Sequence, residues 1–420
     1  MGERCFNGCR AFTSLDIQTS LLEVIPKNAF SGWQHLSEVK FSEGLKEIDE
    51  GNFYNARLVK EVTIPHSVER INASFQDCVS LETLYIGENL QLIGNSSFVS
   101  CESLKKISFE KIPGAISESL KAIGVGAFKS CKSLEEVVFP CPNLESIGDQ
   151  AFNGCSKLKN ADFSNTKIYE VPNGFHGCAF SNVKIVKVAP QPEAEAIKKG
   201  NRYLQASELE TTGMLLPATV TRIKDEAFSS CPNLEEVDLP TDITYIGSNT
   251  FRNTPWMQNW YKNASDGLNY IGTIAFKYVG TKHENSRIII KEGTTIIAGG
   301  LFRDFGSSLV GVSIPNSVME IGENAFRGCS NLTNIYFPNS MTTIGNYAFD
   351  DCKGLTSVTI PDNVTYIGDY AFKNCTNVTD VFCCADPTKL THFSNSSFDG
   401  YRKRIHVPAD RLVDFVKNGG

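Results

Sequence analysis

Apolar and polar residues alternate along this chain in a pattern that returns at a nearly constant step. The clearest copy runs from Ile321 to Pro361, where one unit is written almost twice with a step of 23 residues. The apolar positions of the two units are Ile321, Phe326, Cys329, Leu332, Ile335 and Phe337, then Ile344, Phe349, Cys352, Leu355, Val358 and Ile360. A repeat of about 20 to 29 residues with one short strand per unit indicates a solenoid, in which each unit packs only on its neighbours.

Each unit predicts two short extended segments and one corner. In Leu-x-x-Val-x-Ile-Pro the apolar residues alternate with period two, as at Leu355, Val358 and Ile360, which predicts a strand with one inward face. The proline that follows ends strand pairing because it has no N–H to donate. A second extended piece ends at Ile-Gly, where we expect glycine to permit a tight bend. The motif Ala-Phe-x-x-Cys then predicts a compact corner with phenylalanine in the interior.

Phenylalanine marks the same place in successive units. These residues are Phe6, Phe30, Phe53, Phe75, Phe98, Phe128, Phe152, Phe175, Phe228, Phe251, Phe302, Phe326, Phe349, Phe372 and Phe398. Most steps are 22 to 24 residues, but those that end at Phe128, Phe228 and Phe302 are 30, 53 and 51 residues long. The two longest steps predict insertions at 186–216 and 252–300.

These insertions suggest how the chain is divided. The middle of 186–216 predicts a helix, and 252–300 predicts extra strands that extend a rung, as we call one turn of the solenoid. Near the C-terminus, Ile405 to Pro408 predicts a strand, followed by a short capping helix. Two organisations fit: two solenoid blocks with a cap each, or one continuous solenoid with a bulky insertion. The expected parts are a first block at 1–185, an insertion or inter-block cap at 186–216, a second block at 217–382 and a last repeat with C-terminal cap at 383–420.

The net charge of the chain and its first residues indicate which partners it binds and where in or outside the cell it acts. The 40 Lys and Arg against 47 Asp and Glu give a net charge of −7, which argues against nucleic acid or an anionic membrane as the main partner. No run of about 18 apolar residues is present, so no membrane-spanning helix is predicted. Gly2 to Cys9 aligns with Gly322 to Cys329, so the sequence starts inside a repeat, and it has no signal peptide. Either upstream residues with an export signal precede it, or Met1 replaces the isoleucine of the repeat at a natural start.

Fourteen cysteines raise the question of disulfides or a metal. Ten share one column of the repeat: Cys9, Cys78, Cys101, Cys131, Cys155, Cys178, Cys231, Cys329, Cys352 and Cys375. Trp33 and Ala56 take the same position in other units, which is typical of packing. Because there is no Cys-x-x-Cys pair and no histidine at ligand spacing, we predict buried thiols rather than bridges or a metal site. In an exported protein, any disulfide would involve Cys141, Cys383 or Cys384, which lie outside the column.

One outward side chain stands between the two inward residues of each strand, so these side chains should form a row. Its members are Asp16, Lys40, Thr63, Tyr85, Ser108, Val138, Asp162, Lys184, Asp238, Ser313, Tyr336 and Thr359. Solenoids bind ligands on such a surface, and aromatic residues are enriched at interface centres, so Tyr85 and Tyr336 are the foremost candidates. The alternative is a solvated sheet face, because threonine and tyrosine suit any strand.

A second candidate site is the aromatic cluster from Pro255 to Tyr261. Trp256 and Trp260 could hold a protein or a sugar ring, or they could cover the flank of the core beside the extra strands. Large aromatic residues are mostly well buried, which favours the second interpretation.

The repeat Ile-Gly-x-x-Ala-Phe-x-x-Cys-x-x-Leu-x-x-Val-x-Ile-Pro resembles that of the BspA-like leucine-rich repeat proteins of Bacteroidetes. The resemblance covers nearly the whole chain apart from 186–216. It implies a leucine-rich repeat solenoid of the α/β class, mostly β, which forms a curved right-handed superhelix with short parallel strands on its concave face. It also implies a secreted or surface-displayed protein used in adhesion or protein binding. The family brings no catalytic residues to transfer.

We therefore predict a non-enzymatic, adhesin-like module that recognises another protein, such as a host extracellular protein, through the concave face. No protease, hydrolase, phosphate-loop or dinucleotide fingerprint is present, and we expect no cofactor. A carbohydrate-binding surface protein is the alternative, and it would need exposed stacking faces on Trp256 and Trp260. A structural spacer without a ligand would show a featureless outward row.

Overall fold

The computed structural model describes residues 1–18, 20–109, 117–186, 213–239, 243–393, 396–398 and 404–408. It is a mostly β, parallel solenoid, which confirms the predicted fold class. Two compact units are present: unit 1 comprises Met1–Ile243 and Phe251–Asn259, and unit 2 comprises Thr244–Thr250 and Trp260–Gly420. The helices predicted within 186–216 and after Pro408 fall outside the described residues. The domain limits expected from the sequence stay a prediction.

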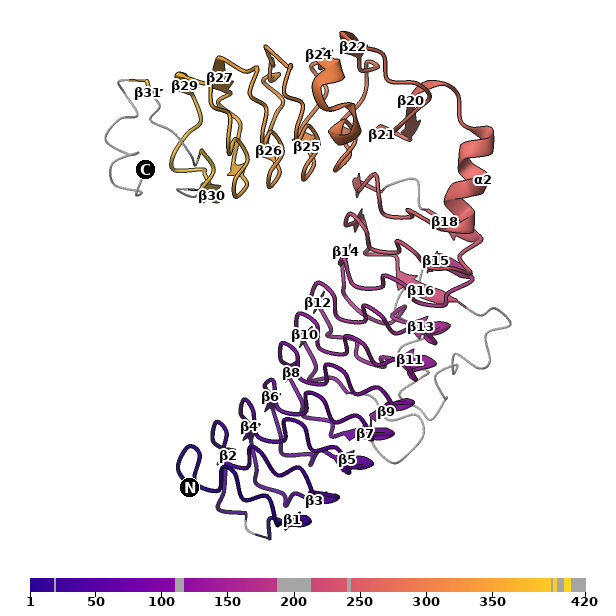
Figure 1. The fold of residues 1–420 in the computed structure, drawn as a ribbon, viewed down its shortest axis with the longest axis vertical. Helices are drawn as coiled ribbons and strands as arrows, with labels where there is room; N and C mark the ends of the chain where they lie inside the picture. Colours follow the sequence, from indigo (N-terminus) through magenta and orange to yellow (C-terminus); the bar gives the residue numbers. More distant parts are fainter. Residues whose placement is uncertain are drawn as a thin grey trace, which may run out of the picture. The chain divides into compact units, whose positions relative to one another are not determined.

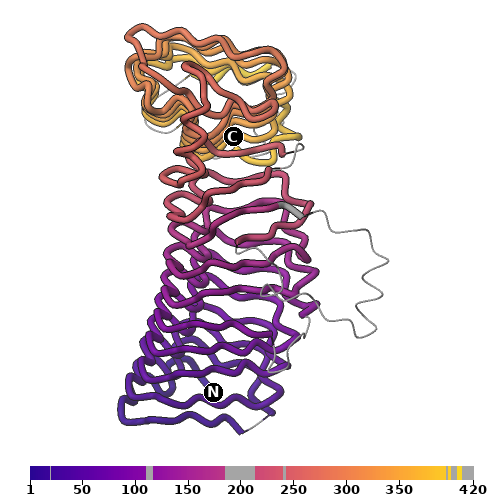
Figure 2. Tube along the Cα trace, turned by 90° about the vertical axis from the view of Figure 1, so that its right-hand side faces the viewer, coloured from indigo at the N-terminus to yellow at the C-terminus, as the bar shows by residue number. Residues whose placement is uncertain are grey.

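Each rung of unit 1 supplies a longer strand and then a two-residue strand. The longer strands are β1 (Ser14–Asp16), β3 (Glu38–Lys40), β5 (Glu61–Thr63), β7 (Thr83–Ile86), β9 (Lys106–Phe109), β11 (Glu136–Val138), β13 (Asn160–Asp162), β15 (Asn182–Val186), β16 (Met214–Pro217) and β18 (Glu236–Asp238). The two-residue strands are β2 (Val24–Ile25), β4 (Glu47–Ile48), β6 (Arg70–Ile71), β8 (Leu92–Ile93), β10 (Ala122–Ile123), β12 (Ser146–Ile147), β14 (Glu170–Val171) and β17 (Arg222–Ile223). The two sets run along opposite edges of unit 1 (Figure 1), and Figure 2 shows its rungs stacked in succession.

The longer strands of unit 1 do not form one continuous sheet. They form three sheets, with strand orders β1-β3, β5-β7-β9 and β11-β13-β16-β15-β18. Strand β16 lies between β13 and β15 although it follows both in sequence, because Met214 pairs with Ala161 on one side and with Val183 on the other. The longest step of the repeat, from Phe175 to Phe228, therefore contains an extra strand, β16, that pairs in parallel within the sheet of longer strands. The sequence pattern did not predict this strand.

The repeated phenylalanines form the interior of both units, as predicted. Successive rings of unit 1 stack with centroids between 4.9 Å and 6.0 Å apart, and those of unit 2 between 4.8 Å and 5.1 Å. Phe75 and Phe349 are fully buried. Each ring thus contacts the ring of the rung before and the rung after, which couples the rungs through buried apolar area.

The glycine of the Ile-Gly pair does not make the bend that the sequence suggested. Positive φ angles fall two residues later, at Tyr347 (53°) and Tyr370 (57°). A Cβ on Gly345 would lie 2.6 Å from the Glu323 nitrogen, and one on Gly368 would lie 2.4 Å from the Asn346 nitrogen. Glycine is needed because the backbone of the preceding rung occupies the place of its side chain.

Nine cysteines of the repeat column are buried, which confirms that this is an interior position. They also make a contact that the sequence did not indicate. Each thiol donates to the carbonyl of the phenylalanine one rung earlier, as Cys352 Sγ does to Phe326 O at 3.1 Å. The column therefore combines packing with a further hydrogen bond to a buried carbonyl, which also accepts from a backbone N–H, as Phe326 O does from Cys329 N at 3.1 Å. No disulfide joins any of the 14 cysteines, all of which the structure describes.

We expect the column thiols to be unreactive in the native protein. Burial raises the pKa of Cys78, and likewise that of Cys329, to about 12, so the reactive thiolate is scarce at neutral pH. Alkylation at pH 8 followed by mass spectrometry should label Cys5, Cys9 and Cys384, which are not buried, and should label the column only after unfolding. Rapid native labelling of Cys78 or Cys329 would contradict this prediction.

Unit 2 continues the pattern and adds a hairpin. Its two-residue strands are β19 (Tyr245–Ile246), β23 (Ile296–Ile297), β25 (Glu320–Ile321), β26 (Thr343–Ile344), β28 (Tyr366–Ile367) and β30 (His392–Phe393). Its longer strands are β22 (Ser286–Ile289), β24 (Leu309–Ser313), β27 (Ser357–Ile360), β29 (Asp380–Cys383) and β31 (Arg404–His406). The remaining elements are α2 (Pro255–Asn263), which spans both units, the hairpin strands β20 (Gly267–Ile271) and β21 (Ile274–Val279), and the 3-10 helix η2 (Arg303–Ser308).

Two strand predictions in unit 2 can be compared with the structure. The extra strands expected within 252–300 are present, since β21 pairs antiparallel with β20 and parallel with β23. The strand expected around Tyr336 is not formed as a hydrogen-bonded strand, although Phe337 nearby is buried as predicted. The alternation of apolar residues thus predicted the burial correctly but not the backbone pairing.

Candidate functional site

Strand register places the predicted outward residues of unit 1 side by side in three groups. Asp16 lies beside Lys40, and Thr63, Tyr85 and Ser108 are in line. The third group is Val138, Asp162, Leu215, Lys184 and Asp238, in that order. Leu215 enters the row because β16 is intercalated there. The role of this row in binding stays a prediction.

Asp162 does not fit the outward row as expected. Its side chain is only 8% exposed, and its Oδ1 accepts hydrogen bonds from Ser164 N at 2.9 Å and from Ser164 Oγ at 2.6 Å. The carboxylate satisfies the turn that follows its strand, a local role common for aspartate. The Asp162 carboxylate is therefore not presented to a ligand.

Unit 2 carries three exposed apolar side chains at outward positions of the repeat, two on the longer strands β22 and β29 and one, Tyr336, where no hydrogen-bonded strand forms. Ile289 is 81% exposed, Tyr336 68% and Phe382 41%. The register sets Ile289 beside Ser313, and Phe382 between Thr359 and His406. The rings of Phe382 and His406 stack with centroids 4.5 Å apart. We call Ile289, Tyr336 and Phe382 the unit 2 apolar row.

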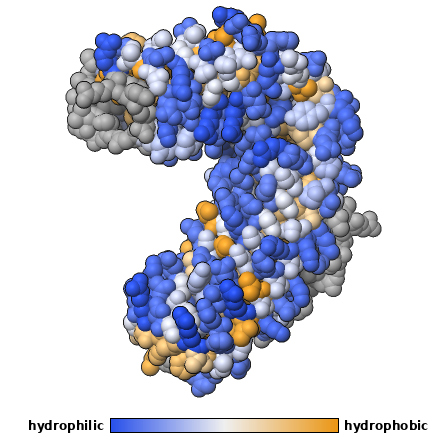
Figure 3. Space-filling model, in the orientation of Figure 1, coloured by the Kyte–Doolittle hydropathy of each residue, from blue (hydrophilic) through white to orange (hydrophobic). Residues whose placement is uncertain are grey.

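The sequence analysis named Tyr336 but missed Ile289 and Phe382. Phe382 lies between Val381 and Cys383, both buried, so the period-two alternation around it did mark it as outward. We missed it because the last repeat departs from the Leu-x-x-Val-x-Ile-Pro pattern. Elsewhere, the face of the molecule in view in Figure 3 is mostly hydrophilic, with apolar side chains scattered among polar ones.

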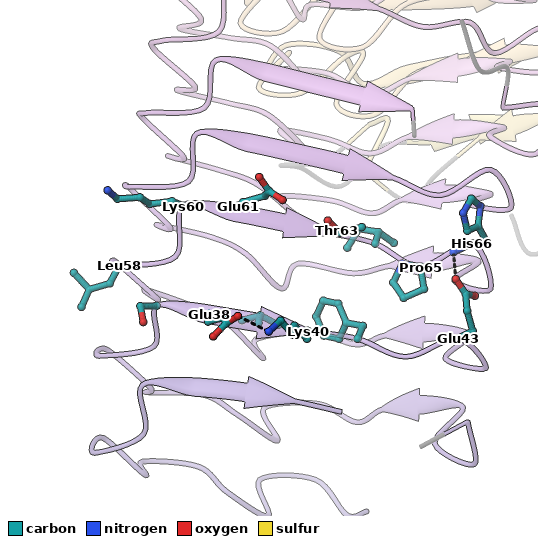
Figure 4. A pocket seen from close by; sticks show the side chains of 13 residues that line it. Glu38, Lys40, Glu43, Leu58, Lys60, Glu61, Thr63, Pro65 and His66 are labelled. Carbon is teal, nitrogen blue, oxygen red and sulfur yellow. Dashed lines mark hydrogen bonds and ion pairs between the residues drawn. The ribbon is translucent and has the colours of Figure 1, made fainter. Parts of the chain in front are cut away.

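Unit 1 contains a cleft of about 730 Å³ between β3 and β5 (Figure 4). Lys40 and Thr63, two of the predicted ligand contacts, line it from its two sides. Within β3, Lys40 Nζ forms an ion pair with Glu38 at 2.6 Å. At one end, the Glu43 carboxylate accepts from His66 N at 3.1 Å, across the cleft.

At Phe30, a side chain replaces one backbone contact between the two rungs that flank this cleft. Phe30 N donates to the Asn52 side chain at 3.3 Å, whereas Phe53 N in the next rung donates to the Ser74 carbonyl at 2.8 Å. The Phe30 and Phe53 rings are 6.0 Å apart, the widest spacing among the successive stacked phenylalanines that the structure describes.

The two tryptophans of α2 are half-buried against interior rings. Trp256 lies 4.6 Å from Phe251, and Trp260 contacts Phe276 edge-on at 5.5 Å. This packing favours the interpretation that they cover the flank of the core. Their role in ligand binding stays a prediction.

The described part of the chain contains no cluster of three His, Cys, Asp or Glu side chains that could hold a metal ion. Among the described helices, none has the length and apolar content needed to cross a membrane.

Turns of about 23 residues that each supply a short strand to a parallel ladder are the architecture of leucine-rich repeat solenoids. The family model for the BspA type leucine rich repeat region matches residues 1–120, 72–199, 173–282, 200–332 and 295–409. The chain therefore belongs to the BspA-type leucine-rich repeat family.

Several solved structures are similar to this chain in sequence and repeat. A leucine-rich repeat protein from Bacteroides ovatus is 21% identical over 94% of both chains, with a TM-score of 0.40. A leucine rich cell surface protein from Faecalibacterium prausnitzii is 21% identical over 90% of this chain and 86% of its own, with a TM-score of 0.36. The pneumococcal vaccine antigen PcpA is 18% identical over 85% and 86%, with a TM-score of 0.34. Comparison with curated proteins found no match.

Proposed function

We propose that this chain is a non-enzymatic protein-binding module, secreted or displayed at the cell surface, that recognises another protein through the outward face of its longer strands. The observation that carries the proposal is the unit 2 apolar row. Family membership supports the location and the absence of catalysis.

The physical argument rests on the exposure of these side chains. An apolar side chain held in water loses the free energy that burial would provide, about 25 cal/mol for each Å² of apolar surface. Single exposed apolar residues are common, but Ile289, Tyr336 and Phe382 take the same outward position of the repeat within a single unit. Tyrosine and phenylalanine are favoured in interface centres because their rings bury a large area with little loss of conformational freedom.

The alternatives have less support from the described residues. A spacer has no need of exposed aromatic side chains at repeated outward positions. Carbohydrate binding would use a free aromatic face, whereas the rings of Trp256 and Trp260 pack on Phe251 and Phe276. We therefore propose a protein ligand.

The test begins with a binding screen of the purified chain against extracellular proteins, with a glycan array in parallel. For a protein that binds, we expect Tyr336→Ser to weaken affinity about tenfold or more, as loss of an aromatic contact at an interface centre does. Titration by calorimetry would measure the change.

Tyr169→Ser is the matched control, because Tyr169 is 59% exposed but lies next to the two-residue strand β14. It should leave affinity unchanged. Equal affinities for wild type, Tyr336→Ser and Phe382→Ser would rule out the unit 2 apolar row as the site. Binding to glycans alone would overturn the proposed protein ligand.

A further inference from the structure

The cleft between β3 and β5 is a gap in the ladder of longer strands. Strand β3 pairs with β1, and β5 pairs with β7, but β3 and β5 belong to separate sheets. Between the next two longer strands, β5 and β7, Ile64 N donates to Tyr85 O at 2.9 Å. The equivalent groups at the gap are Phe41 N and Thr63 O, and both residues line the cleft. Two strand edges thus face each other across the cleft, and because some of their Cα atoms lie within 8 Å of one another, an added strand requires the two rungs to part.

Another part of unit 1 shows that this ladder accepts an added strand. Strand β16 lies between β13 and β15 and pairs in parallel with both. The phenylalanines of the two separated rungs, Phe152 and Phe175, remain stacked at 5.4 Å. The rungs can therefore separate at the longer strands while the stacked phenylalanine rings stay in contact.

We propose that the β3–β5 cleft binds an extended segment of a partner protein as an added strand. This inference rests on the proposed protein-binding function and names the chemistry of the partner. Strand edges recognise a main chain of extended conformation through its N–H and C=O groups. Since β3 and β5 have three residues each, with a rise of about 3.3 Å per residue, the bound segment would contain about three to five residues.

The lining of the cleft indicates which side chains that segment carries. Its apolar residues include Leu58, which is half exposed, and Ile64, which is buried. Its charged residues have both signs: Lys40 and Lys60 lie beside Glu38, Glu43 and Glu61. Successive residues of a strand point to opposite faces, so the segment should alternate apolar residues toward the core with polar residues toward this mixed lining.

The test selects linear peptides from a random displayed library on the full chain and then closes the cleft. Lys40→Cys with Thr63→Cys would join the two strands when oxidised, in a background where the accessible Cys5, Cys9 and Cys384 are serine. We expect oxidation to weaken peptide binding about tenfold or more and reduction to restore it. Ala122→Cys with Ser146→Cys, which joins the hydrogen-bonded β10 and β12, is the matched control and should have no effect.

Two further measurements make the result independent of the disulfide. Thr63→Trp should fill the cleft and weaken binding, whereas Ser146→Trp should not. Peptides with N-methyl groups at alternate residues should lose binding whichever set of residues is methylated, because a strand between two neighbours donates from one set of N–H groups to β3 and from the other set to β5. Binding that tolerates methylation of either set would overturn insertion between the two strands.

The remaining outcomes separate this inference from the proposed function. A protein ligand that binds the closed-cleft variant as tightly as the wild type would overturn the inference and leave the proposed function standing. A peptide that binds the cleft when no folded extracellular protein binds the chain would overturn the proposed function and leave the inference standing. Failure to select any peptide that the closed cleft excludes, or dimerisation lost on oxidation, would overturn the proposal of a partner segment.

Discussion

Phe349→Ala is expected to lower the free energy of unfolding by about 3 to 5 kcal/mol, the range for removing a large buried aromatic side chain. Phe349 is fully buried and stacks on Phe326 at 5.0 Å and on Phe372 at 5.1 Å. Its loss would leave a cavity between three rungs. Denaturant unfolding followed by circular dichroism would measure the change, and hydrogen exchange should show lost protection in the adjacent rungs, because repeats couple mainly to neighbours.

Phe6→Ala tests the same stack of phenylalanine rings at a position where the ring is less buried. Phe6 is 43% exposed and stacks on Phe30 at 5.7 Å. We expect a loss of about 1 kcal/mol. Equal losses for the two variants would show that stacking within the column does not determine the stability of the rungs.

Gly345→Ala is expected to destabilise unit 2 by about 3 kcal/mol or more, although it adds a single methyl group. The new Cβ would lie 2.6 Å from Glu323 N and 2.7 Å from Gly322 C, both backbone atoms of the preceding rung. Backbone atoms cannot rotate away as side-chain ends can, so the rungs would have to separate and weaken the β25–β26 pairing. Thermal unfolding and the stability in denaturant would report the effect.

Gly328→Ala separates this steric effect from the conformational preference of glycine. Gly328 has a φ of 76°, and no atom lies within 4 Å of the place its Cβ would take. We expect a loss of about 1 kcal/mol, from the backbone conformation alone. A loss at Gly345 no larger than that at Gly328 would contradict the close approach of the rungs.

The candidate sites show how far the sequence leads toward function. The outward position of Tyr336 followed from period-two alternation, which is local and needs no knowledge of neighbouring rungs. The burial of Asp162 did not follow, because it depends on the turn made with Ser164. The cleft could not be predicted either, since it depends on Asn52 and Glu43 contacting residues about 23 positions away in the chain.

The sequence by itself determined the repeat, the two strands per rung and the interior positions of the phenylalanines and column cysteines. These follow from the spacing of apolar residues, because a side chain that recurs at the same place in every unit must meet its own copy when the units stack. Only the tertiary structure decided which strands pair, where β16 is intercalated and where the ladder opens between β3 and β5. Backbone pairing between rungs depends on how closely two turns approach, and that approach depends on single positions, such as Gly345, where a Cβ would lie 2.6 Å from a backbone nitrogen of the preceding rung.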